Sequence, residues 1–205
     1  MDIVICSLPT SKEVKSVAEA IPECEISRSK YGGVIYNSDE SGPDAFSRPI
    51  IVDTSSGDFF MTREIGREIL KPKNITMVDC PVSGGPAGAY AATLTAMYGT
   101  DIDEALDVVD PVISSFAKNR SQAGECGAAH AVKAINNILL ATNLISITEG
   151  VLALKNCGIK PENALTIINK ASGRSLQSEV RMLEQVLTRD FAYGFQHALM
   201  RKDVT

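Results

Sequence analysis

The first half of this chain alternates short apolar runs with helical patterns, and this alternation limits the fold more than any other feature. Apolar runs of strand length cover residues 2–8, 49–53 and 75–82. Helical patterns follow the first two runs, at residues 13–20 and 59–70. Strands buried on both faces read as continuous apolar runs, and they occur in parallel sheets covered by helices. The alternation therefore predicts an α/β fold with a doubly wound parallel sheet.

Three further assignments complete this half of the chain. Residues 93–99 have the pattern of another strand, and residues 102–116 have that of a helix. Residues 27–49 are rich in Ser, Gly, Asp and Pro, which predicts a long loop. Thr10 or Ser11 can cap the first helix, because a hydroxyl oxygen accepts a hydrogen bond from a backbone N–H of the first turn.

From Gly124 onward the chain has helical periodicity and no strand pattern. Residues 128–156 predict one long helix, and Gly158 stands at the C′ position, where a left-handed backbone conformation ends many helices. We therefore expect an α/β sheet domain over residues 1–123, followed by a long helix and an all-α domain over residues 124–205.

Composition excludes several classes of function. The 205 residues include 20 Lys and Arg against 25 Asp and Glu, a net charge of −5, and no basic run. Nucleic acid and anionic membrane are therefore not expected as partners. His130 and His197 are far apart and lack zinc-site spacing, so no metal is expected. Five cysteines without a CxxC pair are typical of a reducing compartment.

The apolar stretch at residues 134–154 contains three asparagines and Glu149, so it predicts a buried helix rather than a membrane span.

Ser83, Gly84 and Gly85 follow the third strand, at an edge of the sheet where ligands bind in this class of fold. Consecutive backbone N–H groups without side chains can hold a carboxylate or phosphate, and the serine hydroxyl adds a donor. The alternative is a glycine-rich turn that binds no ligand.

Lys133 and Asn137 are four residues apart, so they share one face of the predicted long helix. A partly buried lysine beside an amide suits proton transfer to an alcohol or carbonyl oxygen, because burial lowers the pKa of a lysine toward neutrality. The alternative is a lysine that extends its charged end into water. We expect His130 to pack or to form hydrogen bonds rather than to catalyse, since nothing nearby would orient it.

Together these segments resemble the β-hydroxyacid dehydrogenase family, which includes 3-hydroxyisobutyrate dehydrogenase and is related to 6-phosphogluconate dehydrogenase. The motifs that carry the resemblance stand in the family's order across nearly the whole chain. They are Leu8-Pro9-Thr10, Asp53-Thr54-Ser55-Ser56, DCPVSGGPAGAYAATLTAMYG (79–99), GECGAAHAVKAINN (124–137) and LMRKDV (199–204).

The resemblance implies NAD(P)-dependent interconversion of a short 3-hydroxy acid, such as 3-hydroxyisobutyrate, and its semialdehyde. Lys133 matches the family's general acid/base, and Asn137 matches the residue that holds the reacting oxygen. Further matches concern the ligands: Ser83, Gly84 and Gly85 for the substrate carboxylate, and Leu8, Pro9, Ser56 and Lys202 for NAD or NADP. The resemblance also implies a homodimer or homotetramer in the cytoplasm or the mitochondrial matrix.

One departure from the family pattern concerns the start of the fold. The family begins with a strand, a GxGxxG-type loop and a helix that bind the cofactor diphosphate, and this chain has no such unit. We therefore expect an incomplete Rossmann-type domain in which the strand at residues 2–8 has an exposed apolar edge. A rival interpretation is a truncated, non-catalytic relative that serves as an oligomerisation or binding module. The joint retention of four residues favours the enzyme, since a scaffold has no evident need for all of them: Lys133, Asn137, Ser83 and Lys202.

Overall fold

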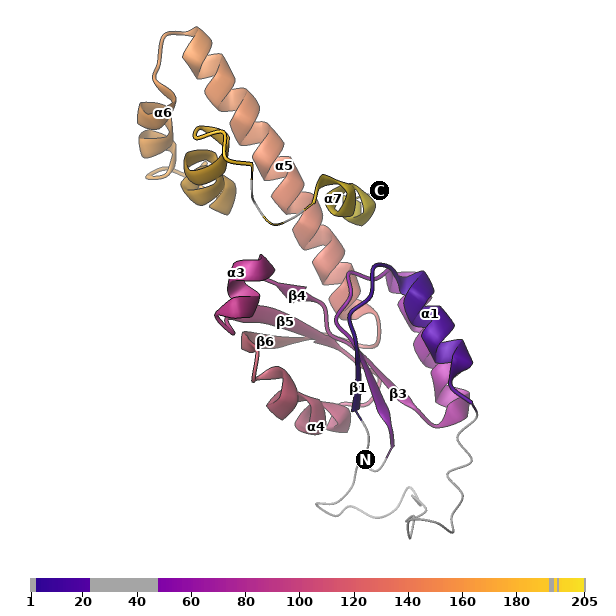
Figure 1. The fold of residues 1–205 in the computed structure, drawn as a ribbon. Coiled ribbons are helices and arrows are strands. Elements are labelled where there is room, and N and C mark those ends of the chain that lie inside the picture. The colour runs from indigo at the N-terminus through magenta and orange to yellow at the C-terminus, as the bar shows by residue number, and fades with distance from the viewer. Residues whose placement is uncertain (1–2, 23–47, 192–193, 195, 205) are drawn as a thin grey trace, which may run out of the picture. The chain divides into compact units, whose positions relative to one another are not determined.

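The structure is a computed structural model, and it describes residues 3–22, 48–191, 194 and 196–204 (Figure 1). The chain divides into two compact units, Met1–Ala134 and Ile135–Thr205, which are considered separately below. The long loop expected over residues 27–49 lies outside the described residues, apart from its last two positions.

The first unit is built on a mixed sheet whose central strands are parallel. Strand β1 (Ile3–Cys6) pairs with β2 (Ile50–Asp53), and β2 pairs with β3 (Thr76–Asp79). Within the described residues the strand order is β1-β2-β3-β5-β4, and β6 lies off this path and pairs in parallel with β5. The Rossmann-like α/β fold expected from the sequence is therefore confirmed in its parallel strands.

The second half of this sheet differs from the expectation of an all-parallel sheet. Strand β5 (Leu94–Gly99) runs antiparallel to β3 and to β4 (Val82–Ser83). A parallel return needs a crossover of about a dozen residues or more. Between β4 and β5 the chain has only ten residues, 84–93, including the short helix α3 (Gly85–Tyr90), so the strand comes back antiparallel.

The single strand expected at residues 75–82 is two strands, because Pro81 interrupts the ladder between β3 and β4. Proline has no backbone N–H to donate to a neighbouring strand. Strand β6 (Ala117–Gly124) has no counterpart among the expected elements. Its sequence, AKNRSQAG, is polar, and of its side chains only that of Ala117 is buried. Apolar patterning therefore could not show that it pairs with β5.

Helices cover both faces of the sheet, which is the doubly wound arrangement (Figure 1). Alternate residues of β2 point to opposite cores. Ile50 and Val52 pack in a cluster with Val109 of α4 (Glu104–Ile113). Ile51 packs in the other cluster, whose helical members come from α1 (Ser11–Ala20) and from a segment made of α2 (Phe59–Glu64), η1 (Ile65–Leu70) and η2 (Lys71–Lys73).

Both helix starts in this region are capped as their sequences indicate. Thr10 Oγ1 accepts a hydrogen bond from Lys12 N at the start of α1. Asp58 Oδ1 accepts one from Met61 N, 2.8 Å away, at the start of α2. The helix expected over residues 59–70 is continuous, although its second half, η1, is a π-helix.

The long helix α5 (Ala128–Asn156) begins in the first unit and continues into the second. Its end is a Schellman motif: Gly158 has a φ of +81°, and Ile159 N donates to Leu154 O over 3.0 Å. The predicted helix and its glycine stop are therefore confirmed. The second unit continues with α6 (Pro161–Ile168), the π-helix η3 (Gln177–Val186) and α7 (His197–Val204).

The prediction that α5 is a buried helix is wrong for much of its length. Apolar side chains along it are exposed, among them Ile135, Leu139, Ile145 and Leu152. In the described part of the chain, α5 is the one helix long and apolar enough to cross a membrane, a test that core helices of soluble proteins also pass. The helical periodicity of the sequence predicts where the helix lies in the chain, but not which segments pack against it.

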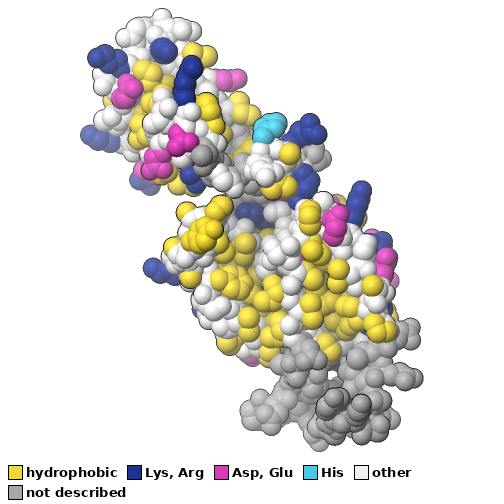
Figure 2. Space-filling view, in the orientation of Figure 1, with side chains coloured by type: hydrophobic (Ala, Val, Ile, Leu, Met, Phe, Trp, Pro, Cys, Tyr) yellow, Lys and Arg dark blue, Asp and Glu magenta, His cyan; other side chains and the backbone are white. Residues whose placement is uncertain are grey.

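Strand β1 also exposes apolar side chains. Val4 is 47% exposed and Ile5 is 44% exposed, although both belong to a strand-like apolar run. Figure 2 shows apolar side chains gathered over the part of the first unit where Figure 1 draws β1. Among the described residues β1 pairs with β2 alone, as expected for an apolar edge.

Candidate active site

The carboxyl ends of the three parallel strands form one edge of the first unit. Cys6, Asp53 and Asp79 end β1, β2 and β3, and they lie opposite one another in the sheet register. The loops that follow are tied together. Thr54 N and Thr54 Oγ1 both donate to Cys6 O over 2.8 Å. Leu8 N donates to Ser55 Oγ over 2.9 Å. In open α/β sheets this edge is where ligands bind.

Three of the four predicted cofactor residues lie on these paired loops. Leu8 and Ser56 are half-buried, and Pro9 is exposed. An apolar side chain and a hydroxyl that remain accessible at this edge fit one end of a dinucleotide. Gly57 does not provide space for the dinucleotide. A Cβ there would lie 2.6 Å from His130 Cε1, so the space beside Gly57 is filled by the His130 side chain. Within the described residues nothing supplies a glycine-rich loop for the diphosphate.

The Ser83-Gly84-Gly85 segment joins β4 to α3. Gly84 has a φ of +134° and Gly85 a φ of +64°, conformations that favour glycine. A Cβ on Gly84 would lie 2.9 Å from Leu94 Cδ2, whereas a Cβ on Gly85 would meet nothing within 4 Å. Glycine at position 84 is therefore required by backbone conformation, and a side chain there would also have to displace the end of Leu94. Gly85 is open to its surroundings, as an anion-binding position must be.

Lys133 lies in the second turn of α5 and is 9% exposed. A lysine that extended its charged end into water would be far more exposed. The structure therefore argues against a lysine that extends its charged end into water.

Asn137 and Lys202 belong to the second unit, and Asp203 joins them. Asn137 is 3% exposed, and its Nδ2 donates to Asp203 Oδ2 over 2.8 Å. The other oxygen of this carboxylate, Oδ1, lies 3.0 Å from Lys202 Nζ. Asp203 was not among the expected site residues. An acidic residue beside a lysine near the end of a helix carries no sequence signal that distinguishes it from a solvated surface pair.

His130 is fully buried and has two partners that orient its ring. Nδ1 lies 2.8 Å from Thr62 Oγ1, and Nε2 donates to Ser55 O over 3.0 Å. The expectation that it packs and forms hydrogen bonds is confirmed, whereas the statement that nothing nearby would orient it is wrong. Thr62 and Ser55 are 68 and 75 residues away in the sequence, so only the fold could reveal them.

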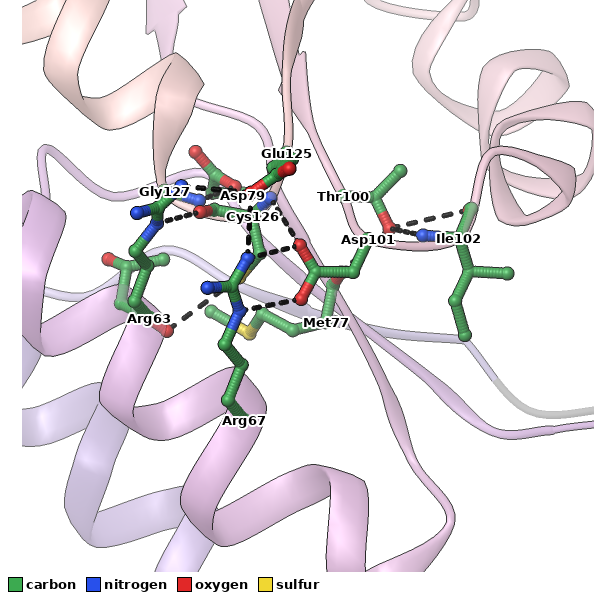
Figure 3. Close-up of polar contacts among 11 residues, drawn as sticks. Arg63, Arg67, Met77, Asp79, Thr100, Asp101, Ile102, Glu125, Cys126 and Gly127 are labelled. Carbon is green, nitrogen blue, oxygen red and sulfur yellow. Dashed lines mark hydrogen bonds and ion pairs between the residues drawn. The ribbon is translucent and has the colours of Figure 1, made fainter.

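A network of polar contacts surrounds the start of α5 (Figure 3). Asp79 is fully buried and accepts hydrogen bonds from Gly127 N and His130 N. Burial raises the pKa of Asp79 above its ordinary value, and the His130 ring and the two backbone N–H groups act against this rise. Asp53 is also fully buried, and within the described part of the chain its Oδ2 has no hydrogen-bond partner.

Comparison with known proteins now assigns the family. The model for the NAD binding domain of 6-phosphogluconate dehydrogenase matches residues 1–128, more than half of the chain. The chain belongs to the β-hydroxyacid dehydrogenase family. The model for the NAD-binding region of NADP-dependent 3-hydroxyisobutyrate dehydrogenase matches the remainder, residues 127–205. Both matches are to NAD-binding regions, in agreement with the cofactor class that the resemblance implied.

Several relatives of this family member are similar along almost its whole length. It is 36% identical over 203 residues to the 2-(hydroxymethyl)glutarate dehydrogenase of Eubacterium barkeri, covering 99% of this chain and 61% of the relative. It is 30% identical over 211 residues to a probable mitochondrial 3-hydroxyisobutyrate dehydrogenase of Dictyostelium discoideum, covering 99% and 59%.

A solved structure gives the same assignment. The 3-hydroxyisobutyrate dehydrogenase of Mycobacterium tuberculosis, solved with L-serine, superposes with a TM-score of 0.79 at 28% identity. The superposition covers 98% of this chain and 64% of that structure. The chain thus spans about three fifths of the length of the relatives it matches.

Proposed function

We propose that this protein is an NAD(P)-dependent oxidoreductase that interconverts a short 3-hydroxy acid and its semialdehyde. The observation that carries the proposal is Lys133, a lysine removed from water in the second turn of α5. The helix start that precedes it is bound by the carboxylate that ends β3, so Lys133 belongs to the carboxyl edge of the parallel strands. The matches to NAD-binding regions support a cofactor at this edge, where ligands bind in open α/β sheets.

The names of the relatives narrow the substrate class. 2-(Hydroxymethyl)glutarate, 3-hydroxyisobutyrate and L-serine all contain a hydroxymethyl group on the carbon next to a carboxylate. They differ only in the third substituent of that carbon. The substrate proposed for this chain is therefore a 2-substituted 3-hydroxypropanoate, such as 3-hydroxyisobutyrate.

Each predicted residue then has one task. Ser83, Gly84 and Gly85 bind the substrate carboxylate through the hydroxyl and backbone N–H groups. Lys133 accepts the hydroxyl proton when the alcohol is oxidised and returns it to the carbonyl oxygen in the reverse direction. Asn137 holds the same oxygen.

Leu8, Pro9, Ser56 and Lys202 contact NAD or NADP, which when bound supplies the acceptor or donor of the hydride. We also propose that the protein acts as a homodimer or homotetramer.

The rival function is a binding or oligomerisation module without catalysis. It is favoured by one observation, the absence of a diphosphate-binding glycine loop among the described residues. Titration of the 205-residue protein with NADH and NADPH, followed by nucleotide fluorescence, separates the two. Saturable binding and turnover of 2-substituted 3-hydroxypropanoates support the enzyme. Absence of both at cofactor concentrations that saturate the relatives supports the module.

A further inference from the structure

The helix that carries Lys133 is capped by a residue of the sheet instead of by the residue before the helix. Asp79 Oδ1 accepts a hydrogen bond from Gly127 N over 2.7 Å, and Asp79 Oδ2 accepts one from His130 N over 3.0 Å. The first N–H groups of a helix have no partner within it. One carboxylate therefore binds two of them from a position 48 residues earlier in the chain.

Two glycines next to Asp79 and α5 allow this contact. Gly99 of β5 lies opposite Asp79 in the sheet. A Cβ on Gly99 would lie 2.4 Å from Asp79 Oδ1 and 2.8 Å from Asp79 Cγ. Gly127 has a φ of +89°, and a Cβ on it would lie 3.0 Å from Phe59 O. Glycine at position 99 therefore leaves space for the Asp79 carboxylate, and glycine at position 127 permits the positive-φ turn whose N–H binds it.

A second carboxylate fixes the turn that leads into α5 (Figure 3). Asp101 Oδ1 accepts a hydrogen bond from Cys126 N over 3.1 Å. Arg67 donates to both oxygens of Asp101, each over 2.8 Å. Arg63 Nε donates to Cys126 O over 3.0 Å, and both arginines reach Glu125 Oε2. Asp101 thus binds the turn before α5. Asp79 binds two backbone N–H groups, that of Gly127 just before the helix and that of His130 in its first turn.

The side chain of His130 completes the attachment. Its backbone N–H is bound to Asp79, and its ring is bound to Ser55 of the β2 loop and Thr62 of α2. His130 precedes Lys133 by three residues, which is less than one helical turn or roughly 4.5 Å along the axis. A shift of the helix start therefore moves Lys133 by about the same amount.

We propose that Asp79, assisted by Asp101, is a positioning residue for Lys133. It acts through the backbone of α5 and not through contact with substrate. The inference rests on the proposed function only for its kinetic consequence. A displacement of about 1 Å in a catalytic group can cost roughly 100-fold in rate.

The test compares two carboxylate variants in the full chain. Asp79→Asn keeps the size of the side chain but loses its charge and one accepting oxygen. Asp110→Asn is the matched control, because Asp110 also accepts two hydrogen bonds, and its donors, Tyr98 and Arg120, belong to β5 and β6 instead of α5. The measurements are thermal unfolding, kcat and KM, NADH binding, and acetylation of Lys133 by acetic anhydride, quantified by mass spectrometry.

The expected result for Asp79→Asn is a kcat lower by about 10- to 100-fold, with KM and NADH affinity within about twofold. Acetylation of Lys133 should rise several-fold, while Asp110→Asn changes only the unfolding temperature. If Asp79→Asn does not fold, Asp101→Asn tests the same attachment from its half-exposed side. Folded variants whose Lys133 acetylation and kcat equal those of Asp110→Asn would overturn the proposal. Should the wild-type protein be inactive, the proposed function fails, and the acetylation comparison still decides the positioning role.

Discussion

At the scale of single residues, the site depends on groups that folding removes from water against their preference. Lys133, Asn137, Asp79 and His130 are all buried polar residues, and each costs free energy unless its hydrogen bonds are made. The structure makes them with partners distant in sequence, such as Asp203 for Asn137. Such an arrangement is typical of functional sites, where polar groups needed for the reaction are buried at a cost in folding stability.

Lys133→Ala should abolish most turnover and leave the fold intact. General acid/base groups contribute roughly 100- to 10,000-fold to rate, so a loss of that size is expected in kcat. Lys155→Ala is the control, because it removes an exposed lysine from the last turn of the same helix. Circular dichroism and steady-state kinetics measure the two effects. A Lys133→Ala protein with kcat close to that of Lys155→Ala would contradict the assignment.

Gly84 and Gly85 should respond differently to alanine. Gly85→Ala places a non-glycine residue at positive φ in open space, which costs about 1–2 kcal/mol. Gly84→Ala places alanine at a φ of +134°, outside the left-handed region open to other residues, and adds a collision with Leu94, so its free energy of unfolding should fall further. Urea denaturation of both variants measures the order. Equal losses, or a greater loss for Gly85→Ala, would show that the packing of Gly84 against Leu94 is unimportant.

At the scale of elements, α5 is held by ion pairs whose strength depends on pH. The Arg67 guanidinium lowers the pKa of Asp101, with help from the Cys126 N–H, below the ordinary aspartate value of about 3.9. A carboxylate whose pKa is lowered by folding stabilises the folded state above its unfolded pKa. That contribution is lost as the pH falls through the folded pKa. The pKa of Asp79 shifts in the opposite direction, because burial raises it.

Asp101→Asn should therefore lower the unfolding temperature near neutral pH and make little difference in strong acid. The difference from the wild-type protein should shrink as the pH falls from about 4 through the folded pKa of Asp101. Because Asp79 is present in both proteins, its own titration cancels in this difference. Thermal unfolding at a series of pH values gives the result. A difference that grows on acidification would mean that the Arg67–Asp101 pair does not stabilise this region.

At the scale of the whole molecule, the two units have cores of very different size. Among the residues that the structure describes, the first unit has two clusters of buried side chains, one on each face of the sheet. The described part of the second unit has one cluster, formed by Val151, Leu165 and Met182 with partly buried neighbours. Local stability follows the amount of buried apolar surface, so the second unit should open at lower free energy.

Leu165→Ala and Val52→Ala test this difference as a pair. Both residues are fully buried, one in each unit. Leu165→Ala should cost about 2–5 kcal/mol and increase amide hydrogen exchange in α6 and η3 while β2 and β3 remain protected. Val52→Ala should increase exchange in the sheet. Hydrogen-exchange mass spectrometry distinguishes the regions. A uniform increase over both units in either variant would mean that they unfold as one.

Much of the architecture could be predicted from local patterns. The apolar runs gave β1, β2 and β3, and the helical periodicity gave α5 together with its stop at Gly158. Residues 117–124 could not be recognised as a strand, because β6 is polar and owes its existence to backbone pairing with β5. The reversal at β5 was also not visible, since strand direction depends on the length and path of the connection.

The sequence by itself determined the fold class, the family and the identity of Lys133, Asn137 and Ser83 as candidates, because apolar periodicity and motif order are local properties of the chain. Only the tertiary structure decided how the helix that carries Lys133 is held. Asp79, Asp101 and His130 reach partners 25 to 75 residues away, through hydrogen bonds that are formed only after the sheet has brought those segments together. Local patterns carry no information about such contacts, since each residue taken alone is an ordinary polar side chain.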